Sequence, residues 1–226
     1  MHAIDMQVHT NYSYDGYVPL DELDRACSRR MITTVAITDH DEITGGLEAS
    51  RLYGMARFKT RVIVGEEVST TQGEIIGLFL KERIPPGMSM ASTIDAIRDQ
   101  GGVVYLNHPF GYGQRSSRLV IKDLDGLWDK IDIVEIFNGR NRTQEANDRA
   151  KELALKYGKP GGVGSDAHSS WEVGRSYVCV ETFDGPKELV LALRKARYVC
   201  RPCPFVYRVL FKARKLLAPR PVPHSA

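Results

Sequence analysis

Long apolar runs, disulfide patterns and signs of export are all lacking from this sequence. No stretch approaches the roughly 20 apolar residues that a membrane span requires, so we expect no transmembrane helix. The chain leads straight from Met-His-Ala-Ile-Asp into a polar segment, which is not expected of a signal peptide. The four cysteines have no secretory context, which favours free thiols in a reducing compartment. We therefore expect a cytoplasmic protein.

Several common catalytic and nucleotide-binding motifs are missing as well. The sequence has no Gly-x-Ser-x-Gly elbow and no Gly-x-x-x-x-Gly-Lys loop, which argues against a serine hydrolase and a P-loop nucleotide site. Cys200 and Cys203 form one isolated Cys-x-x-Cys pair, which is too little for a zinc ribbon. Any enzymatic chemistry is therefore expected to depend on groups other than a serine nucleophile, a P-loop or a zinc ribbon.

Acidic residues are absent from Arg194 onward, where the sequence holds nine Lys and Arg residues. Such a run is typical of a solvated surface, but it could also contact nucleic acid or an anionic surface. Residues 205–217 have apolar positions near helical spacing, which fits a basic amphipathic helix or a helix packed on the barrel. We expect residues 200–226, with five prolines, to form a basic extension to a domain at residues 1–199.

Apolar segments typical of strands alternate with helix-like segments along most of the chain. Strands are expected at residues 3–9, 34–38, 62–68, 74–80, 103–106, 131–137, 162–164 and 177–180. Helices are expected at residues 19–30, 43–56, 90–100, 144–157 and 186–196. This alternation predicts a largely parallel sheet, and a Thr-Thr-Gln-Gly turn at residues 70–73 adds one hairpin. With about seven β/α units, we expect an α/β fold, a distorted (β/α)7 barrel.

Ionisable side chains cluster where the expected strands end. Asp5, Gln7 and His9 alternate along the first strand and therefore share one face. The carboxyl ends of parallel strands converge on one rim, where active sites form. Imidazoles and carboxylates without thiolates suit Zn, Mn or Fe, and two or three such ions can activate water for attack on phosphorus. The other groups at this rim are Asp15, His40, Glu66, Glu67, His108, Asp166 and His168.

The order of these groups resembles the PHP (polymerase and histidinol phosphatase) family. The resemblance is carried by Asp-x-x-x-His-Thr-x-Tyr-Ser-x-Asp-Gly at residues 5–16, Thr-Asp-His-Asp at 38–41, Gly-x-Glu at 65–67, His-Pro at 108–109 and Ser-Asp-Ala-His at 165–168. It runs in order over residues 4–197. The resemblance implies a distorted seven-stranded β/α barrel with a trinuclear metal centre at its C-terminal rim. It also implies hydrolysis of phosphate esters.

The resemblance also implies roles for individual residues. Asp15, His40 and His168 would hold one metal ion together, and Asp15, His40 and Glu67 would be catalytic. Glu67 would bridge two ions, with Glu66 as the alternative if the register slips by one. The full set of metal ligands that the resemblance implies is Gln7, His9, Asp15, His40, Glu67, His108, Asp166 and His168.

Two positions depart from the family pattern. The opening motif of the family is His-x-His, whereas this sequence has Gln7 before His9. A further family histidine, on the strand after Glu67, is expected to be replaced by Ile76. Because an amide oxygen is a weaker donor than imidazole, we expect two to three divalent ions (Zn, Mn or Fe), with one position weakened or empty. Lost catalysis, with the fold kept for binding, is the alternative.

Several loop residues near these motifs are candidates for binding a substrate phosphate, since a guanidinium can pair with it through two hydrogen bonds. Asn138 is a further candidate, for binding substrate or supporting the ligands, with a simple turn role as the alternative. We expect a small phosphorylated metabolite or nucleotide as substrate, with nucleic-acid ends as the alternative. The candidate arginines are Arg115, Arg118, Arg140, Arg142 and Arg175.

Overall fold

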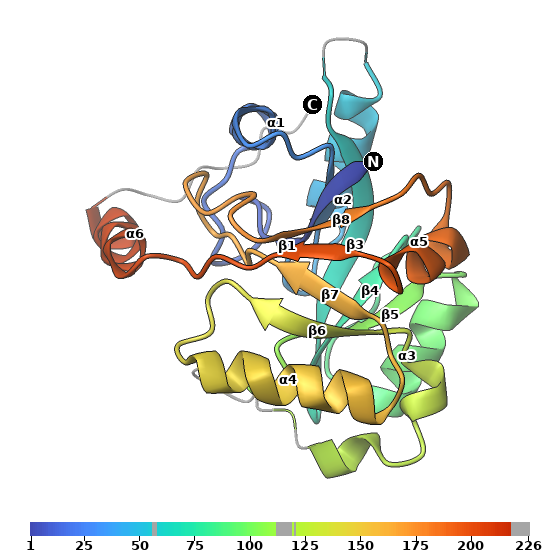
Figure 1. Ribbon diagram of the computed structural model, residues 1–226. Coiled ribbons are helices and arrows are strands. Elements are labelled where there is room, and N and C mark those ends of the chain that lie inside the picture. Colours follow the sequence, from blue (N-terminus) through green and yellow to red (C-terminus); the bar gives the residue numbers. More distant parts are fainter. Residues whose placement is uncertain (56–57, 112–118, 120, 218–226) are drawn as a thin grey trace.

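Strands and helices alternate along the chain and build one barrel-shaped sheet with helices outside it (Figure 1). The computed structural model describes residues 1–55, 58–111, 119 and 121–217, without the side chains of residues 123, 214 and 215. No helix in these ranges is long and apolar enough to cross a membrane. The strands are β1 (His2–Val8), β2 (Thr34–Ile37), β3 (Arg61–Thr70), β4 (Gly73–Leu78), β5 (Val103–Leu106), β6 (Ile133–Asn138), β7 (Gly161–Gly164), β8 (Tyr177–Val180) and β9 (Arg197–Val199). The helices are α1 (Leu20–Arg29), α2 (Thr44–Tyr53), α3 (Met90–Asp99), α4 (Gln144–Lys156), α5 (Pro186–Leu193) and α6 (Phe205–Leu217), with 3-10 turns at Ile121–Leu124 and Trp128–Lys130.

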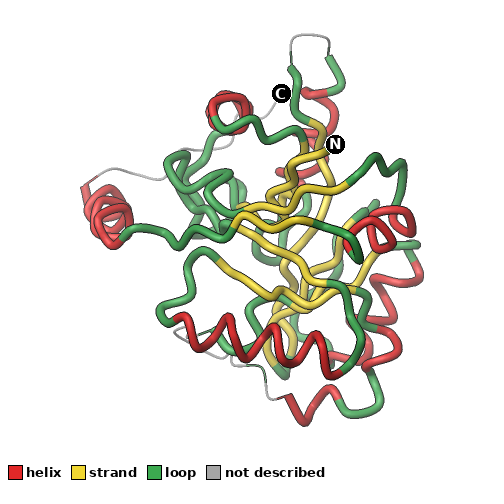
Figure 2. The backbone as a smooth tube through the Cα atoms, viewed as in Figure 1, coloured by secondary structure: helices red, strands yellow, loops and turns green. Residues whose placement is uncertain are grey.

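The sheet has the order β7-β6-β5-β4-β3-β2-β1-β8-β9. Strands β1, β2 and β3 are parallel, as are β5, β6 and β7, while β4 runs antiparallel to both neighbours. Beyond β1, the strands β8 and β9 are antiparallel additions. Val8 also bridges Ala167 just after β7, which brings the ends of the seven-strand run together. The expected distorted barrel is confirmed, with its strands inside and helices around them (Figure 2). Strands β8 and β9 extend the sheet at one edge.

Glycines in β7 allow the barrel to close tightly. A Cβ atom on Gly164 would lie 2.7 Å from the Cβ of Gln7, and one on Gly162 would lie 2.5 Å from the Tyr105 ring. A Cβ atom at either position would force its neighbours to shift, so glycine allows β7 to approach β1 and allows the Tyr105 ring to pack against β7. This approach brings the ends of β1 and β7 side by side, at the place where the candidate ligands lie.

A buried carboxylate fastens this closure. Asp5 on β1 accepts hydrogen bonds from the backbone N–H of Ser165 and of Gly174, each at 2.8 Å, and from the Ser165 hydroxyl at 2.5 Å. Its side chain is fully buried. Burial raises the pKa of Asp5 to about 7, against the effect of these donors. Asp5 belongs to the opening motif, but its contacts show that it joins the segment after β7 to β1.

Helix α6 lies at the edge of the barrel, apart from the other helices (Figure 1). Its Phe211 is 7% exposed and contacts the rings of Tyr17 and His168, with centroids 5.5 and 5.9 Å away. Other apolar residues of the helix, including Phe205 and Leu217, are exposed. Residues 205–217 are therefore helical, as expected, and one face of the helix packs on the rim of the barrel.

Candidate metal centre

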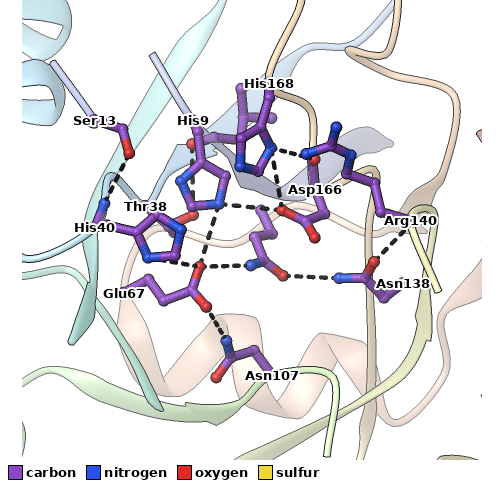
Figure 3. A network of polar contacts seen from close by, with 12 residues as sticks. His9, Ser13, Thr38, His40, Glu67, Asn107, Asn138, Arg140, Asp166 and His168 are labelled. Atoms are coloured by element: carbon purple, nitrogen blue, oxygen red, sulfur yellow. Dashed lines mark hydrogen bonds and ion pairs between the residues drawn. The ribbon is translucent and has the colours of Figure 1, made fainter. Parts of the chain in front are cut away.

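Imidazoles and carboxylates from distant parts of the chain meet at the C-terminal ends of the strands (Figure 3). Ligand atoms in each of two groups lie within 4.8 Å of one another. The first group contains His9, Asp15, His40 and His168, and the second contains His40, Glu67 and Glu74. His108 and Asp166 adjoin them, with His108 Nε2 at 3.0 Å from Glu67 and Asp166 Oδ1 at 3.2 Å from His9. The structure thus brings the predicted histidines and acids together.

Glu67 is the most densely contacted acid in this cluster. It is 1% exposed, and its two oxygens lie 3.0 Å from His108 Nε2 and 3.2 Å from His9 Nε2. The side-chain amides of Gln7 and Asn107 donate hydrogen bonds to Glu67 Oε2 and Oε1, at 2.8 and 2.6 Å. Burial alone would raise the pKa of Glu67, but the surrounding imidazoles hold it well below its usual range. An ionised carboxylate fixed between several imidazoles is suited to bridge two cations.

The donor geometry around His9 fits a cation. His9 is fully buried, and its Nε2 lies 3.2 Å from both Glu67 Oε2 and Asp166 Oδ1. Within the part of the chain that the structure describes, neither ring nitrogen of His9 makes a well-oriented hydrogen bond. A buried imidazole without such partners is costly, whereas a metal ion shared with the two carboxylates would satisfy its nitrogen. The residues present therefore fit a divalent metal.

The acids of the cluster favour a proton on the buried imidazole of His108. Burial alone would lower the pKa of His108, but the Glu67 carboxylate beside it raises the pKa to about 10. Burial would likewise raise the pKa of Asp166, but the imidazoles around it and the guanidinium of Arg140 lower it to about 2. A divalent ion would take the place of such protons, because ligating histidines must be neutral.

The backbone is strained at two of the clustered residues. His108 has φ 23° and Asp166 has φ 54°, in the region that non-glycine residues rarely adopt. Each residue lies two positions after the last residue of a strand and directs its side chain into the cluster. Strain of this kind is characteristic of functional sites, where the surrounding structure holds a required geometry.

Gln7 occupies the position where the family pattern has histidine, and both ends of its amide are engaged. Its nitrogen donates to Glu67 Oε2 at 2.8 Å, and its oxygen accepts from Asn138 Nδ2 at 3.2 Å. Gln7 thus lies in the cluster as expected, but its oxygen is directed to Asn138. This contact favours a supporting role for Gln7 over metal ligation.

The Gln7→His variant is expected to bind about one additional metal equivalent per chain, because an imidazole is a stronger donor than an amide. Metal content after dialysis against Zn or Mn, measured by elemental analysis, tests this expectation. Gln144→His on the surface of α4 is the matched control and should bind no additional metal. Unchanged metal in a folded Gln7→His protein would contradict the expectation.

Glu74 is a cluster residue that the sequence interpretation missed. Its Oε1 lies 3.7 Å from His40 Nδ1, and it reaches the site from β4. Burial and the neighbouring Glu67 raise the pKa of Glu74 to about 8. Ile76, two residues further along the same strand, lies in the apolar core. The strand after Glu67 therefore does supply a candidate ligand, a carboxylate in place of an imidazole.

The ambiguity between Glu66 and Glu67 has a clear geometric answer. Successive residues of β3 point to opposite faces, and Glu67 faces the cluster. Glu66 Oε2 instead accepts a hydrogen bond from the backbone N–H of Ile84 at 2.9 Å.

The candidate substrate-binding residues are divided between several places. Arg140 lies at the edge of the cluster, where its Nε is 3.1 Å from Glu172 and its guanidinium covers the Phe211 ring. Arg175 faces the C-terminal segment instead, with its guanidinium 5.4 Å from the centroid of Tyr207. Both amide hydrogens of the buried Asn138 are directed to Gln7 and Glu135, beneath the cluster. Arg115 and Arg118 lie outside the described residues.

Comparisons with protein families and curated proteins agree with this geometry. The model of the PHP domain matches residues 5–159, and the PHP-associated model matches residues 144–198. The uncharacterized protein MJ0417 of Methanocaldococcus jannaschii is 36% identical over 178 residues, covering 77% of this chain and 69% of its own length. The uncharacterized protein MJ1587 of the same organism is 37% identical over 163 residues, covering 67% of this chain and 91% of its own length.

Solved structures share the fold at low sequence identity. A two-domain protein of Bacteroides vulgatus, which contains a predicted PHP-like metal-dependent phosphoesterase, matches with a TM-score of 0.68 and 18% identity. The match covers 88% of this chain but only 65% of that protein. An amidohydrolase of Chromobacterium violaceum with bound sulfate and no metal matches with a TM-score of 0.61 and 19% identity, covering 93% of this chain and 96% of the other.

Proposed function

The chain belongs to the PHP domain family, and on that premise we propose that it is a metal-dependent hydrolase of phosphate esters. The observation that carries the proposal is the convergence of four imidazoles and four carboxylates at one end of the barrel. This donor set suits Zn, Mn or Fe. A small phosphorylated metabolite or nucleotide is the substrate class that we propose.

The chain's own residues divide into two ligand groups. Asp15 holds the first together, because its Oδ2 lies 3.1 Å from His168 Nε2 and 3.7 Å from His40 Nε2. Glu67 holds the second together, between His108 and His9, which also adjoins the first group, with Asp166 and Glu74 at its borders. Bound divalent ions supply an activated water and positive charge for the phosphoryl oxygens. Glu67 is the group that would join the two sites.

We propose that Arg140 holds the phosphate of the substrate. Its side chain is 21% exposed, so it is accessible at the edge of the cluster. The Glu172 carboxylate and the Phe211 ring fix the orientation of the guanidinium. A preoriented guanidinium loses less conformational entropy when it binds a phosphate through two hydrogen bonds.

Replacing Arg140 by glutamine should raise the KM for a phosphomonoester at least about tenfold, because a charged hydrogen bond contributes about 1.5–3 kcal/mol. Steady-state kinetics at saturating metal measure the effect. Arg142, another candidate, is exposed and makes no ion pair or hydrogen bond among the described residues. Arg51→Gln is the matched control, since Arg51 lies on α2 and pairs with Glu48 on the same helix. Equal KM values for the two variants would contradict the role of Arg140.

A substrate panel with added Mn or Zn tests the proposed function itself. Hydrolysis of nucleotide or sugar monophosphates is the expected result. Preferential cleavage of oligonucleotides, falling steeply with salt, would instead support a nuclease. Failure on every phosphate ester would favour the alternative of a binding module without catalysis.

A further inference from the structure

A concave region separate from the metal centre lies between α1, the loop after β7 and α6. It has a volume of about 560 Å³, and none of its lining residues belongs to the metal-ligand cluster. Its character is unusual because basic and aromatic side chains occur together. The lining residues that matter here are Arg25, Arg29, Arg30, Trp171 and Tyr207, and we call this region the arginine groove.

Positive charge in the arginine groove is poorly compensated. Among the described residues, no carboxylate lies within 4.0 Å of Arg29, Arg30 or Arg175, whereas Arg25 pairs with Asp21 at 2.6 Å. Arg30 is anchored by a 3.2 Å hydrogen bond to the backbone carbonyl of Trp171. Burial and the neighbouring guanidinium of Arg175 lower the pKa of Arg30. Glu22 is the one acid in the lining, so an anion entering the groove would reduce the repulsion between guanidiniums.

Two aromatic rings border the same space. Trp171 is 39% exposed, although tryptophan is usually well buried. Its ring lies 6.3 Å from the ring of Tyr207, at an interplanar angle of 46°. The Arg175 guanidinium covers the Tyr207 ring at 5.4 Å, and its buried Nε has no hydrogen-bond acceptor among the described residues. An exposed indole and a half-buried phenol ring beside guanidiniums are typical of surfaces on which nucleobases stack.

We propose that the arginine groove binds a nucleoside phosphate, with the phosphate on Arg29 and Arg30 and the base against Trp171 and Tyr207. A simple phosphate would leave the rings unused, and an acidic peptide would offer them no flat partner. The groove adjoins the metal centre through α6, because Phe211, one turn after Tyr207, contacts His168. This binding does not depend on the proposed hydrolase activity.

Fluorescence of Trp171 in the full-length protein provides the test. The other tryptophan, Trp128, is 8% exposed and stacks on Tyr157 at 3.7 Å, so it is shielded from added ligand. We expect AMP to quench the exposed tryptophan saturably, and adenosine or inorganic phosphate alone to bind at least about tenfold more weakly. Polarisation of a fluorescent AMP analogue provides an independent measurement of affinity.

Substitutions on the groove separate this site from the metal centre. Arg29→Gln and Tyr207→Leu should each weaken AMP binding about tenfold, and Arg29→Gln should leave p-nitrophenyl phosphate hydrolysis unchanged. The control is Arg51→Gln on α2, where an exposed arginine pairs with Glu48, and it should bind AMP like the parent protein. Circular dichroism verifies the fold of each variant.

Absence of saturable binding, or equal affinity in parent and groove variants, would overturn the proposal. A tetranucleotide that binds more tightly than AMP, with strong salt dependence, would support the groove as a site for nucleic-acid ends. If the tetranucleotide and AMP bind with equal affinity, the groove is supported as a site for free nucleotides. If no phosphate ester is hydrolysed but AMP still binds and its binding depends on Arg29, the proposed hydrolase function is refuted. The proposed nucleotide binding by the arginine groove then still stands.

Discussion

Replacing Glu67 by glutamine is expected to lower kcat/KM at least about 100-fold and to release bound metal. Changes to groups that merely support a metal ligand cost about 10–100-fold, and Glu67 is proposed as a direct, bridging ligand. The substitution keeps the shape of the side chain but removes its charge. The new amide N–H2 group would also face an amide donor, because Gln7 and Asn107 donate hydrogen bonds to the two Glu67 oxygens. Metal content and phosphomonoester kinetics measure both effects.

Glu66→Gln is a matched control for this experiment, because it makes the same chemical change one residue away. Glu66 points to the opposite face of β3, where it accepts a hydrogen bond from Ile84. It should therefore retain its metal and most of its activity. If Glu66→Gln lost metal while Glu67→Gln kept it, the proposed assignment of the bridging ligand would be wrong.

The second large effect concerns stability, and Asp5→Ala is expected to lower the free energy of unfolding by about 3–5 kcal/mol. The substitution leaves the N–H groups of Ser165 and Gly174 and the Ser165 hydroxyl without their buried acceptor. Each buried donor without a partner costs about 1–3 kcal/mol. Urea denaturation followed by circular dichroism measures the change.

Asp95→Ala provides the surface control, since Asp95 is 52% exposed and pairs with Lys130. An exposed pair of this kind contributes about 0–1 kcal/mol. An Asp5→Ala protein as stable as this control would show that Asp5 does not fasten the closure between β1 and the segment after β7.

Most of the fold follows from local patterns in the sequence. All expected strands and helices are present because apolar periodicity and helix-end residues are local signals. Strand direction is not local, so the antiparallel pairing of β8 with β1 could not be predicted. Strand β9 was missed because it has only three residues and is largely exposed, so it shows no apolar pattern.

Site residues that follow the ends of strands could be predicted from the sequence. Contacts between side chains from distant strands could not. His40, His108 and His168 follow strands that end at one rim, so their convergence could be inferred. The sequence interpretation left out Glu74 because the family pattern has an imidazole on this strand, although strand alternation puts Glu74 on the same face as Ile76. The contact of Gln7 with Asn138 joins residues 131 positions apart, which no local pattern reveals.

A metal titration of the purified full-length protein tests the central claim most directly. We expect stripped protein to bind at least two equivalents of Mn or Zn per chain, with phosphomonoester hydrolysis rising in parallel. The Asp166→Asn variant should lose at least one equivalent of metal together with the activity, because the Asp166 and Glu67 carboxylates both lie beside His9 Nε2. A folded protein that binds no stoichiometric transition metal, and hydrolyses no phosphate ester when Mn or Zn is added, would contradict the account.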